Sequence, residues 1–360
     1  MRSLAVCTLL VTVFATSAFS FGYYDSVTMG TMVQGLSPST TALGSVRALG
    51  VLEPAGMFFN PAQTAALPCG VQLAGSSIQW SEQVIQSDIE KMTRTYLTYD
   101  NGTAAIVCPA GMFVVGAGIA KVGEFGYEGS HTVYDDPDDP EIGVAVLYAD
   151  GAQWETLGSL SAMITDKMSA GFSAGMRSVH ADYAYNFNSH QFLIPDSSSA
   201  WSVDDQEFAW HAGVAIDGEM FDSGVSYSSE TDYMDDIIAF GASALAPHLK
   251  NSTVGFEAQV ASPMDHNRFT GDMFVKMPFN DVLNAQISVS FDDNRVASRA
   301  GLGFGLGFDL RLGRFDIGAG LLNRFRSRKN TAFPSEQSDR VDDSFAMICL
   351  GVTSFFGNPQ

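Results

Sequence analysis

Large apolar side chains alternate with small or polar ones along several stretches of this chain. The clearest stretch is 302–312, where leucine or phenylalanine at every second position alternates with glycine, aspartate and arginine. A repeat of two residues places the large apolar side chains on one face of a β-strand. Because glycine and charge would make a poor protein core, we interpret the apolar face as turned to lipid and the opposite face as turned to the lumen of a barrel.

The same alternation recurs at 168–177, 210–217, 254–260 and 283–291. Between these stretches, short polar turns alternate with long polar loops along the chain, which is typical of an outer-membrane barrel. The longest predicted links are 129–152 and 181–206. Counting between the links predicts fourteen strands, near residues 70–80, 92–108, 112–128, 153–165, 168–180, 206–216, 220–230, 235–246, 252–262, 269–276, 283–292, 299–312, 315–326 and 344–356.

Asp100-Asn101-Gly102 interrupts the second predicted strand. Such a tripeptide is typical of a β-bulge or of a tight hairpin turn. We favour the bulge, because a hairpin here would change the even number of strands and move one end of the sheet to the other side of the barrel.

Composition agrees with a sheet that has one face in lipid. The 360 residues include 35 Gly and 26 Phe, and only 16% are charged, where soluble domains carry about a quarter. A soluble secreted β-sandwich or solenoid stays open on composition alone. The net charge of −21 argues against a nucleic-acid partner. Much of the acid lies in blocks that we place in loops: 135–141, Asp204-Asp205, Asp235-Asp236 and Asp342-Asp343.

The two ends of the chain carry export and assembly signals. Residues 1–20 predict a secretory signal peptide, with Arg2 before a short apolar run and small residues before a cut at Phe21. The last strand ends in the outward aromatic Phe356, which looks like the signal read by the barrel-assembly machinery. We therefore expect a Gram-negative-type outer-membrane protein in contact with outer-membrane lipids. Its predicted parts are a signal peptide 1–20, an N-terminal segment 21–69, a barrel 70–356 and a C-terminal extension 357–360.

The N-terminal segment lacks strand alternation and is rich in small residues. Its glycine-punctuated run leads to Phe58-Phe59 and then to Asn60-Pro61-Ala62. This order, and its distance from the signal, resembles the opening of the FadL-like long-chain fatty-acid transporter superfamily, and equally its PorV-like, PorQ-like and UPF0164-type branches. The chain departs from the pattern at Leu52-Glu53-Pro54, where relatives carry a more acidic stretch, and at Gln63, where glycine is common.

The resemblance implies that residues 21–69 fold into the lumen as a plug, or hatch. The barrel itself favours this, since fourteen strands enclose a lumen wider than their own side chains can fill. In the plug motif Asn60, Pro61 and Ala62, the amide of Asn60 would satisfy backbone groups at a turn, and Pro61 would fix φ. Alternatively the motif is only a turn that starts the first strand, and the two interpretations are compatible.

The resemblance also implies passive uptake of hydrophobic or amphipathic small molecules, captured among external loops and released sideways through the wall. The candidate ligand-lining residues are apolar side chains of the plug: Leu49, Val51, Met57, Phe58 and Phe59. Their alternative role is to pack the plug against the wall. Two other functions stay open, a PorV-like scaffold for protein secretion or surface attachment and a surface structural protein without cargo.

Chemistry of other kinds has no support in the sequence, so we predict no catalytic residue, metal site or cofactor. The six histidines lack ligand spacing; His211 is expected to face the lumen, and His180 with Asp182 is a pair common in solvated loops. Two prolines and the absence of EF-hand spacing make 135–141 a loop rather than a Ca²⁺ site. Cys69, Cys108 and Cys349 leave room for one disulfide whose pairing stays open.

Overall fold

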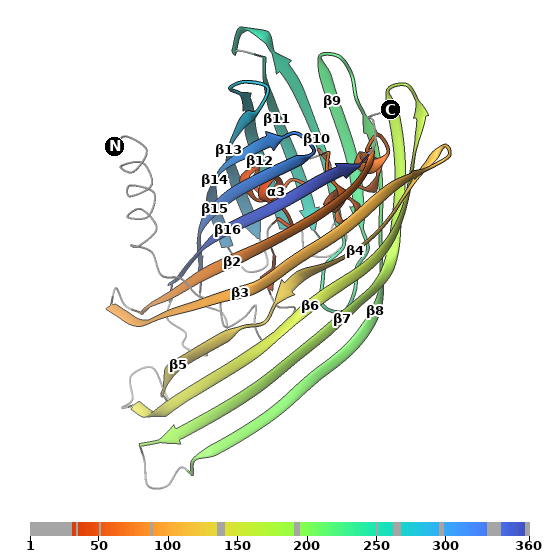
Figure 1. Ribbon diagram of the computed structural model, residues 1–360. Helices are drawn as coiled ribbons and strands as arrows, with labels where there is room; N and C mark the ends of the chain where they lie inside the picture. Colours follow the sequence, from red (N-terminus) through yellow and green to blue (C-terminus); the bar gives the residue numbers. More distant parts are fainter. Residues whose placement is uncertain are drawn as a thin grey trace.

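The computed structural model describes residues 31–33, 35–49, 52–86, 89–134, 141–190, 195–249, 251–261, 268–294, 299–329 and 340–356. The predicted signal peptide 1–20 and extension 357–360 lie outside these ranges. Within them the chain forms one closed antiparallel barrel of fourteen strands, as the alternation predicts (Figure 1). The barrel strands are β2 (Cys69–Gln86), β3 (Ile89–Ala110), β4 (Phe113–Glu124), β6 (Glu141–Thr165), β7 (Met168–Ser189), β8 (Ser197–Ile216), β9 (Phe221–Ser228), β10 (Ile237–Ala246), β11 (Ser252–Ala261), β12 (Arg268–Pro278), β13 (Leu283–Asn294), β14 (Arg299–Leu312), β15 (Phe315–Lys329) and β16 (Arg340–Phe356).

Two pairings close the ring and explain the two strands that stand outside it. The last strand, β16, pairs with the first barrel strand, β2, along its whole length. Strand β4 pairs directly with β6, and the short strand β5 (Tyr127–Tyr134) pairs with the far end of β6. The two-residue strand β1 (Thr31–Met32) lies along β4. The strand predicted at 112–128 is therefore divided into β4 and β5, because β6 is long enough to pair with both.

Several predicted loops are wrong, because the strands continue through them. Strand β6 begins at Glu141, β7 ends at Ser189 and β8 begins at Ser197, within the links predicted at 129–152 and 181–206. A paired strand satisfies its backbone hydrogen bonds whatever the polarity of its side chains, so an apolar pattern does not mark its end.

The acidic blocks divide between strands and loops. Asp204-Asp205 lies in β8 and Asp342-Asp343 in β16, contrary to the prediction, whereas Asp235-Asp236 lies outside the strands as predicted. Residues 135–140 of the first block lie outside the described residues.

Strand β3 confirms the predicted bulge. It runs without interruption from Ile89 to Ala110. Opposite it, the pairing steps from Ser76 with Asn101 to Ile78 with Thr98. Two residues of β3 thus face one residue of β2, which breaks the ladder of hydrogen bonds locally and bends the strand. At the start of β2 and near the end of β3, Cys69 and Cys108 form a disulfide. Cys349 is a buried free thiol.

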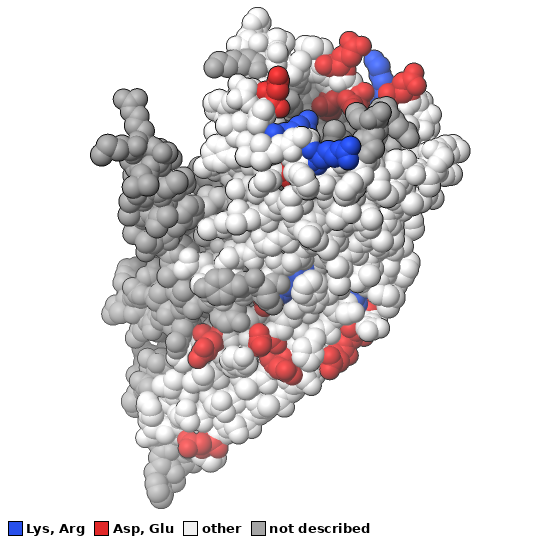
Figure 2. Space-filling view, viewed as in Figure 1, with Lys and Arg blue, Asp and Glu red and all other residues white. Residues whose placement is uncertain are grey.

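The two faces of the wall have opposite chemistry. On β14, Leu302 and Phe304 are more than half exposed on the outside, whereas Gly303 and Gly305 are buried inside. Figure 2 shows a broad belt almost free of charge, with charged side chains towards the two ends of the barrel. Among the described residues, no helix has the length and apolar character needed to cross a bilayer.

Candidate functional site

Residues 31–67, which we call the inner segment, lie against the inward faces of the barrel strands. Its helix α3 (Pro38–Ala42) contacts β13, β14, β15 and β16, and its 3-10 turns η1 (Pro54–Phe58) and η2 (Pro61–Thr64) contact β2, β3, β4, β6, β7 and β8. Ser37 caps α3 by accepting a hydrogen bond from the Thr40 N–H. The inner segment therefore crosses from one side of the barrel to the other, and nearly all of its described residues are buried.

Polar bonds attach the first half of the inner segment to the wall. The carboxylate of Glu257 on β11 accepts the backbone N–H groups of Ala48 and Leu49, at 2.9 and 2.8 Å, and also that of Arg47. Such a carboxylate replaces the water that these three donors would lose inside the barrel. Carbonyl oxygens of the segment are bonded by three further wall side chains: Ser288 to Ala42 at 2.7 Å, Arg324 to Gly44 at 2.6 Å and Gln259 to Ser45 at 2.9 Å.

Inward-facing glycines let the segment's backbone touch the wall. A Cβ atom on Gly305 would lie 2.1 Å from the carbonyl oxygen of Ala42, and one on Gly320 would lie 2.0 Å from that of Pro38. Any side chain at these positions would push the segment away. Gly305 and Gly320 therefore belong to a docking track, the part of the wall on which the backbone of the inner segment rests.

Apolar packing holds the second half of the segment. Met57, Phe58 and Phe59 are buried in a cluster with Val33 and Leu36 of the same segment and with side chains of β2, β3, β4 and β6. Leu49 packs separately, against Leu43, Val46 and Phe274, and it lines the cavity described below. Val51 lies outside the described residues. Four of the five predicted ligand-lining residues are thus inside the barrel, in close packing.

Asn60 connects two parts of the segment. Its Nδ2 donates to the carbonyl of Ala48 at 2.9 Å, and its Oδ1 accepts from the N–H of Ala62 at 3.1 Å, capping η2. Pro61 is the first residue of η2. The plug motif therefore forms an internal turn, with Asn60 fully buried, and β2 begins further along at Cys69.

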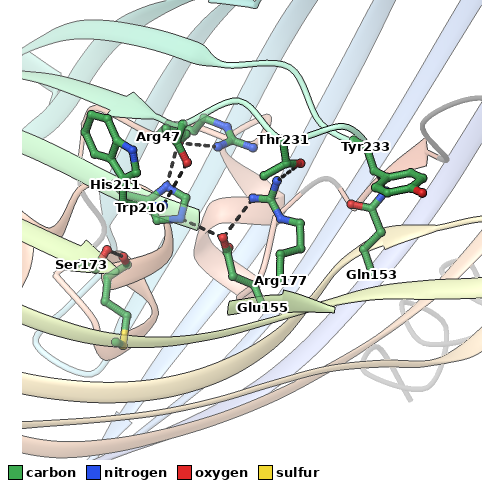
Figure 3. A network of polar contacts seen from close by, with 12 residues as sticks. Arg47, Gln153, Glu155, Ser173, Arg177, Trp210, His211, Thr231 and Tyr233 are labelled. Carbon is green, nitrogen blue, oxygen red and sulfur yellow. Dashed lines mark hydrogen bonds and ion pairs between the residues drawn. The ribbon is translucent and has the colours of Figure 1, made fainter. Parts of the chain in front are cut away.

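A network of charged side chains on the inward faces of β6, β7 and β8 pairs its charges with one another (Figure 3). The carboxylate of Glu155 accepts from Arg177 at 2.9 Å and lies 3.2 Å from Nε2 of His211. His211, inward as predicted, has its Nδ1 2.9 Å from the Ser228 hydroxyl, and Arg177 also donates to Thr231 at 2.9 Å. Each charge is paired and hydrogen-bonded, as burial requires. The arrangement ties the turn around Thr231 to the wall.

A polar cavity of about 490 Å³ opens at the short-turn end of the barrel. The inner segment contributes Leu49, Leu52 and Glu53, and the wall contributes charged groups such as Lys276 and Asp309. Ser37 and Gln72 donate hydrogen bonds to the Glu53 carboxylate, the latter at 2.7 Å. Burial nevertheless raises the pKa of Glu53 to about 7, because removal from water disfavours its charged form.

The outer surface of the wall is hollowed beside the bulge of β3. This outer hollow, of about 550 Å³, is lined by apolar and small residues of β2, β3, β4, β6 and β16: Leu73, Ala74, Gly75, Gly102, Thr103, Ala104, Ile119, Trp154, Leu350, Gly351 and Val352. A Cβ on Gly75 or Gly102 would meet no atom closer than 3.7 Å. Both glycines therefore leave space in the wall that a side chain would occupy.

An inner void lies directly behind the outer hollow. It holds about 10 Å³ and is lined by Val33, Gly35 and Leu36 of the inner segment and by wall residues that include Asn101 and Lys121. The two spaces share Ala74, Gly75, Gly102 and Thr103. The strand pair β2–β3 separates them at the paired residues Gly75 and Gly102, directly beside the bulge, which begins after Ser76 and Asn101.

Three carboxylates could share a cation at the rim formed by β8 and the 231–234 turn. Oxygen atoms of Asp205, Glu207 and Asp232 lie within 4.8 Å of one another. The pair suggested by sequence, His180 and Asp182, is exposed, with 3.6 Å between Nε2 and the carboxylate, and His180 contacts Asp204 more closely, at 2.7 Å. Asp205 and Asp232 are exposed like this pair, so both groups lie at the protein surface.

Two features of this site were not predicted from the sequence. Glu257 was counted only as a lumen-facing residue of an alternating strand, since its backbone partners lie about 210 positions away. Asn101 was noted as part of a bulge but not as a wall of a void. The Asp-Asn-Gly sequence was the available signal for this second feature, because bulges are frequent beside functional sites.

Comparison with known proteins bears on the fold. No protein-family model and no curated protein sequence matches the chain. Among solved structures, a FadL homologue from Pseudomonas aeruginosa has a TM-score of 0.65 at 13% identity, over 91% of this chain and 100% of that one. The Pseudomonas putida toluene transporter TodX has a TM-score of 0.63 at 12% identity, with the same coverage. The CymD monoaromatic hydrocarbon channel has a TM-score of 0.53 at 11% identity, over 91% and 99%. This chain therefore has the fold of FadL-type transport barrels.

Proposed function

We propose that this protein is an outer-membrane barrel that passes small hydrophobic or amphipathic molecules between its lumen and the bilayer, sideways through the wall between β2 and β3. One observation carries the proposal: the outer hollow and the inner void lie back to back across the Gly75–Gly102 pair of β2 and β3, directly beside the bulge that interrupts their ladder. The uncharged outer belt supports a place in a membrane (Figure 2). Two of the similar folds named above, the toluene transporter TodX and the monoaromatic hydrocarbon channel CymD, support the ligand class.

The chemistry of the two ways out of the barrel favours the lateral one. The short-turn end leads through a cavity containing Glu53, Lys276 and Asp309, where an apolar molecule would displace water from charged groups. The wall beside Gly75 opens onto Leu73, Leu350 and Val352, which offer an apolar surface continuous with lipid. A hydrophobic molecule gains about 25 cal/mol for each Å² of surface that leaves water, so the route that stays apolar is the favourable one.

The inner segment would act as the gate of this route. Val33 and Leu36 cover the inner void, and the β1 pairing with β4 at Thr31 and Met32 holds this part of the segment in place. A small shift of residues 31–36 would join the void to the apolar cluster of Met57, Phe58 and Phe59. In this proposal those three residues form the plug surface along which the ligand travels.

Filling the outer hollow tests the proposal. Gly75→Leu and Gly102→Leu add side chains where the nearest atoms leave room, so the barrel should still form, while uptake of decane or toluene by cells expressing it should fall at least about fivefold. Gly158→Leu is the matched control, because Gly158 also faces outward, no atom would lie closer than 3.9 Å to its Cβ, and it lies outside the hollow. Equal uptake by all four proteins, at equal amounts of heat-modifiable barrel, would rule out this route.

A protein scaffold is the second candidate function, and the long strands favour it. Strands β6, β7 and β8 have 25, 22 and 20 residues, about twice the length of a typical membrane strand, and extend beyond their neighbours (Figure 1). Such an extension offers a surface for a secreted protein. Stable co-purification of one protein partner from native membranes, together with no uptake of any hydrophobic probe, would favour the scaffold over the transporter.

A further inference from the structure

The side chain of Asn101 is held with its oxygen atom unpaired. Asn101 is the paired residue directly beside the bulge of β3, opposite Ser76, and is only 4% exposed. Its Nδ2 donates to the Thr98 hydroxyl at 2.8 Å and to the carbonyl of Ser76 at 3.4 Å. The carbonyl oxygen of Ser76 can only accept a hydrogen bond, so the Asn101 amide must turn its nitrogen, and not its oxygen, towards Ser76. Among the described residues, Oδ1 of Asn101 has no hydrogen-bond partner.

Asn101 is also a wall of the inner void. The void of about 10 Å³ has room for one water molecule or one hydroxyl group. Lys121, which also lines it, is paired with Glu124 at 2.5 Å. An entering carboxylate would therefore approach the negative charge of Glu124 as well as the ammonium group. A neutral donor meets no such opposition.

We propose that Asn101 selects, among the molecules that cross the β2–β3 wall, those that carry one neutral hydrogen-bond donor on an apolar body, such as aliphatic alcohols or phenols. This inference rests on the proposed transport function. The hydroxyl of the ligand donates to Oδ1 of Asn101 in the inner void, while its apolar body extends past Gly75 and Gly102 into the outer hollow. A saturated hydrocarbon offers no donor, so it leaves the buried acceptor as it is without ligand and gains nothing from Asn101.

A pair of matched probes tests the selection. Cells that express the protein are given radiolabelled 1-decanol or decane, and initial uptake is measured relative to cells without the barrel. We expect Asn101→Leu, which keeps the volume but removes the acceptor, to lower decanol uptake about three- to tenfold and to leave decane uptake unchanged. Asn323→Leu is the control, because Asn323 lies on β15, away from the void and the hollow.

The outcomes separate this inference from the function on which it rests. If the native barrel takes up neither probe, the transport proposal fails. If both probes enter and Asn101→Leu changes neither, or lowers both equally, transport stands and the void holds a structural water only, which overturns the inference. Asn101→Asp gives an independent check, since a carboxylate keeps the acceptor: decanol preference should persist if the variant folds, as judged by heat-modifiable migration.

Discussion

At the scale of single residues, Glu53 should make the docking of the inner segment depend on pH. Its pKa is raised to about 7 by burial, above that of an exposed glutamate, so the docked segment binds a proton more readily than the undocked one. The stabilisation from the protonated form is complete below about pH 4.5 and is lost as the pH rises through 7. We predict that the free energy that holds the inner segment in place falls by on the order of 3 kcal/mol from pH 5 to pH 8. Protease cleavage within residues 31–67 should therefore increase over this range.

Glu53→Gln should remove most of this dependence, since an uncharged amide can still bond Ser37 and Gln72. Glu219→Gln, at an exposed position in a turn, should leave it unchanged. If Glu53→Gln kept the full pH dependence, another group of the cavity, such as Asp309, would be its source.

Single residues also mark the limit of prediction from sequence. The role of Asn60 at a turn was predictable, because its side-chain oxygen accepts a hydrogen bond from the backbone N–H of Ala62, only two residues further along the chain. The partners of Glu257 and the void at Asn101 were not, because they depend on which distant backbone is brought against them. For the same reason, the sequence predicted that Phe58 and Phe59 belong to the inner segment, but not which wall side chains they pack against.

At the scale of elements, the contact between α3 and the wall makes a sharp prediction. Gly320→Ala places a methyl group 2.0 Å from the Pro38 carbonyl, so α3 must move away from β15 while the ladder of β15 with its neighbours stays intact. We expect a folded, heat-modifiable barrel whose residues 35–49 exchange amide hydrogens faster. Gly158→Ala, with nothing closer than 3.9 Å, should show native exchange. Unchanged exchange in Gly320→Ala would mean that α3 does not rest on this track.

The elements themselves were predictable where the wall has two unlike faces. The boundaries of β11, β13 and β14 lie within two residues of the predicted ones, because alternation persists along these strands. The start of β8 was missed because Ser197-Ser198-Ser199 is polar on both faces. The start of β6 was missed although 142–149 is largely apolar, because the acidic block before it was extended into one long loop. The bulge in β3 was predicted because Asp-Asn-Gly disturbs a strand locally.

The whole molecule depends on an environment that covers its apolar belt, and one pair of variants tests this directly. Phe304, 52% exposed near the middle of β14, would tolerate a charge within about 0.5 kcal/mol on a soluble protein. In a bilayer, Phe304→Arg should lower the free energy of unfolding by about 2–4 kcal/mol, whereas Leu312→Arg, at the end of the same strand, should cost at most about 1 kcal/mol. Folding titrations in lipid vesicles measure both. Because the two side chains are similarly exposed and differ in depth, only a surrounding membrane gives this gradient, and equal small effects would contradict the placement on which both proposals depend.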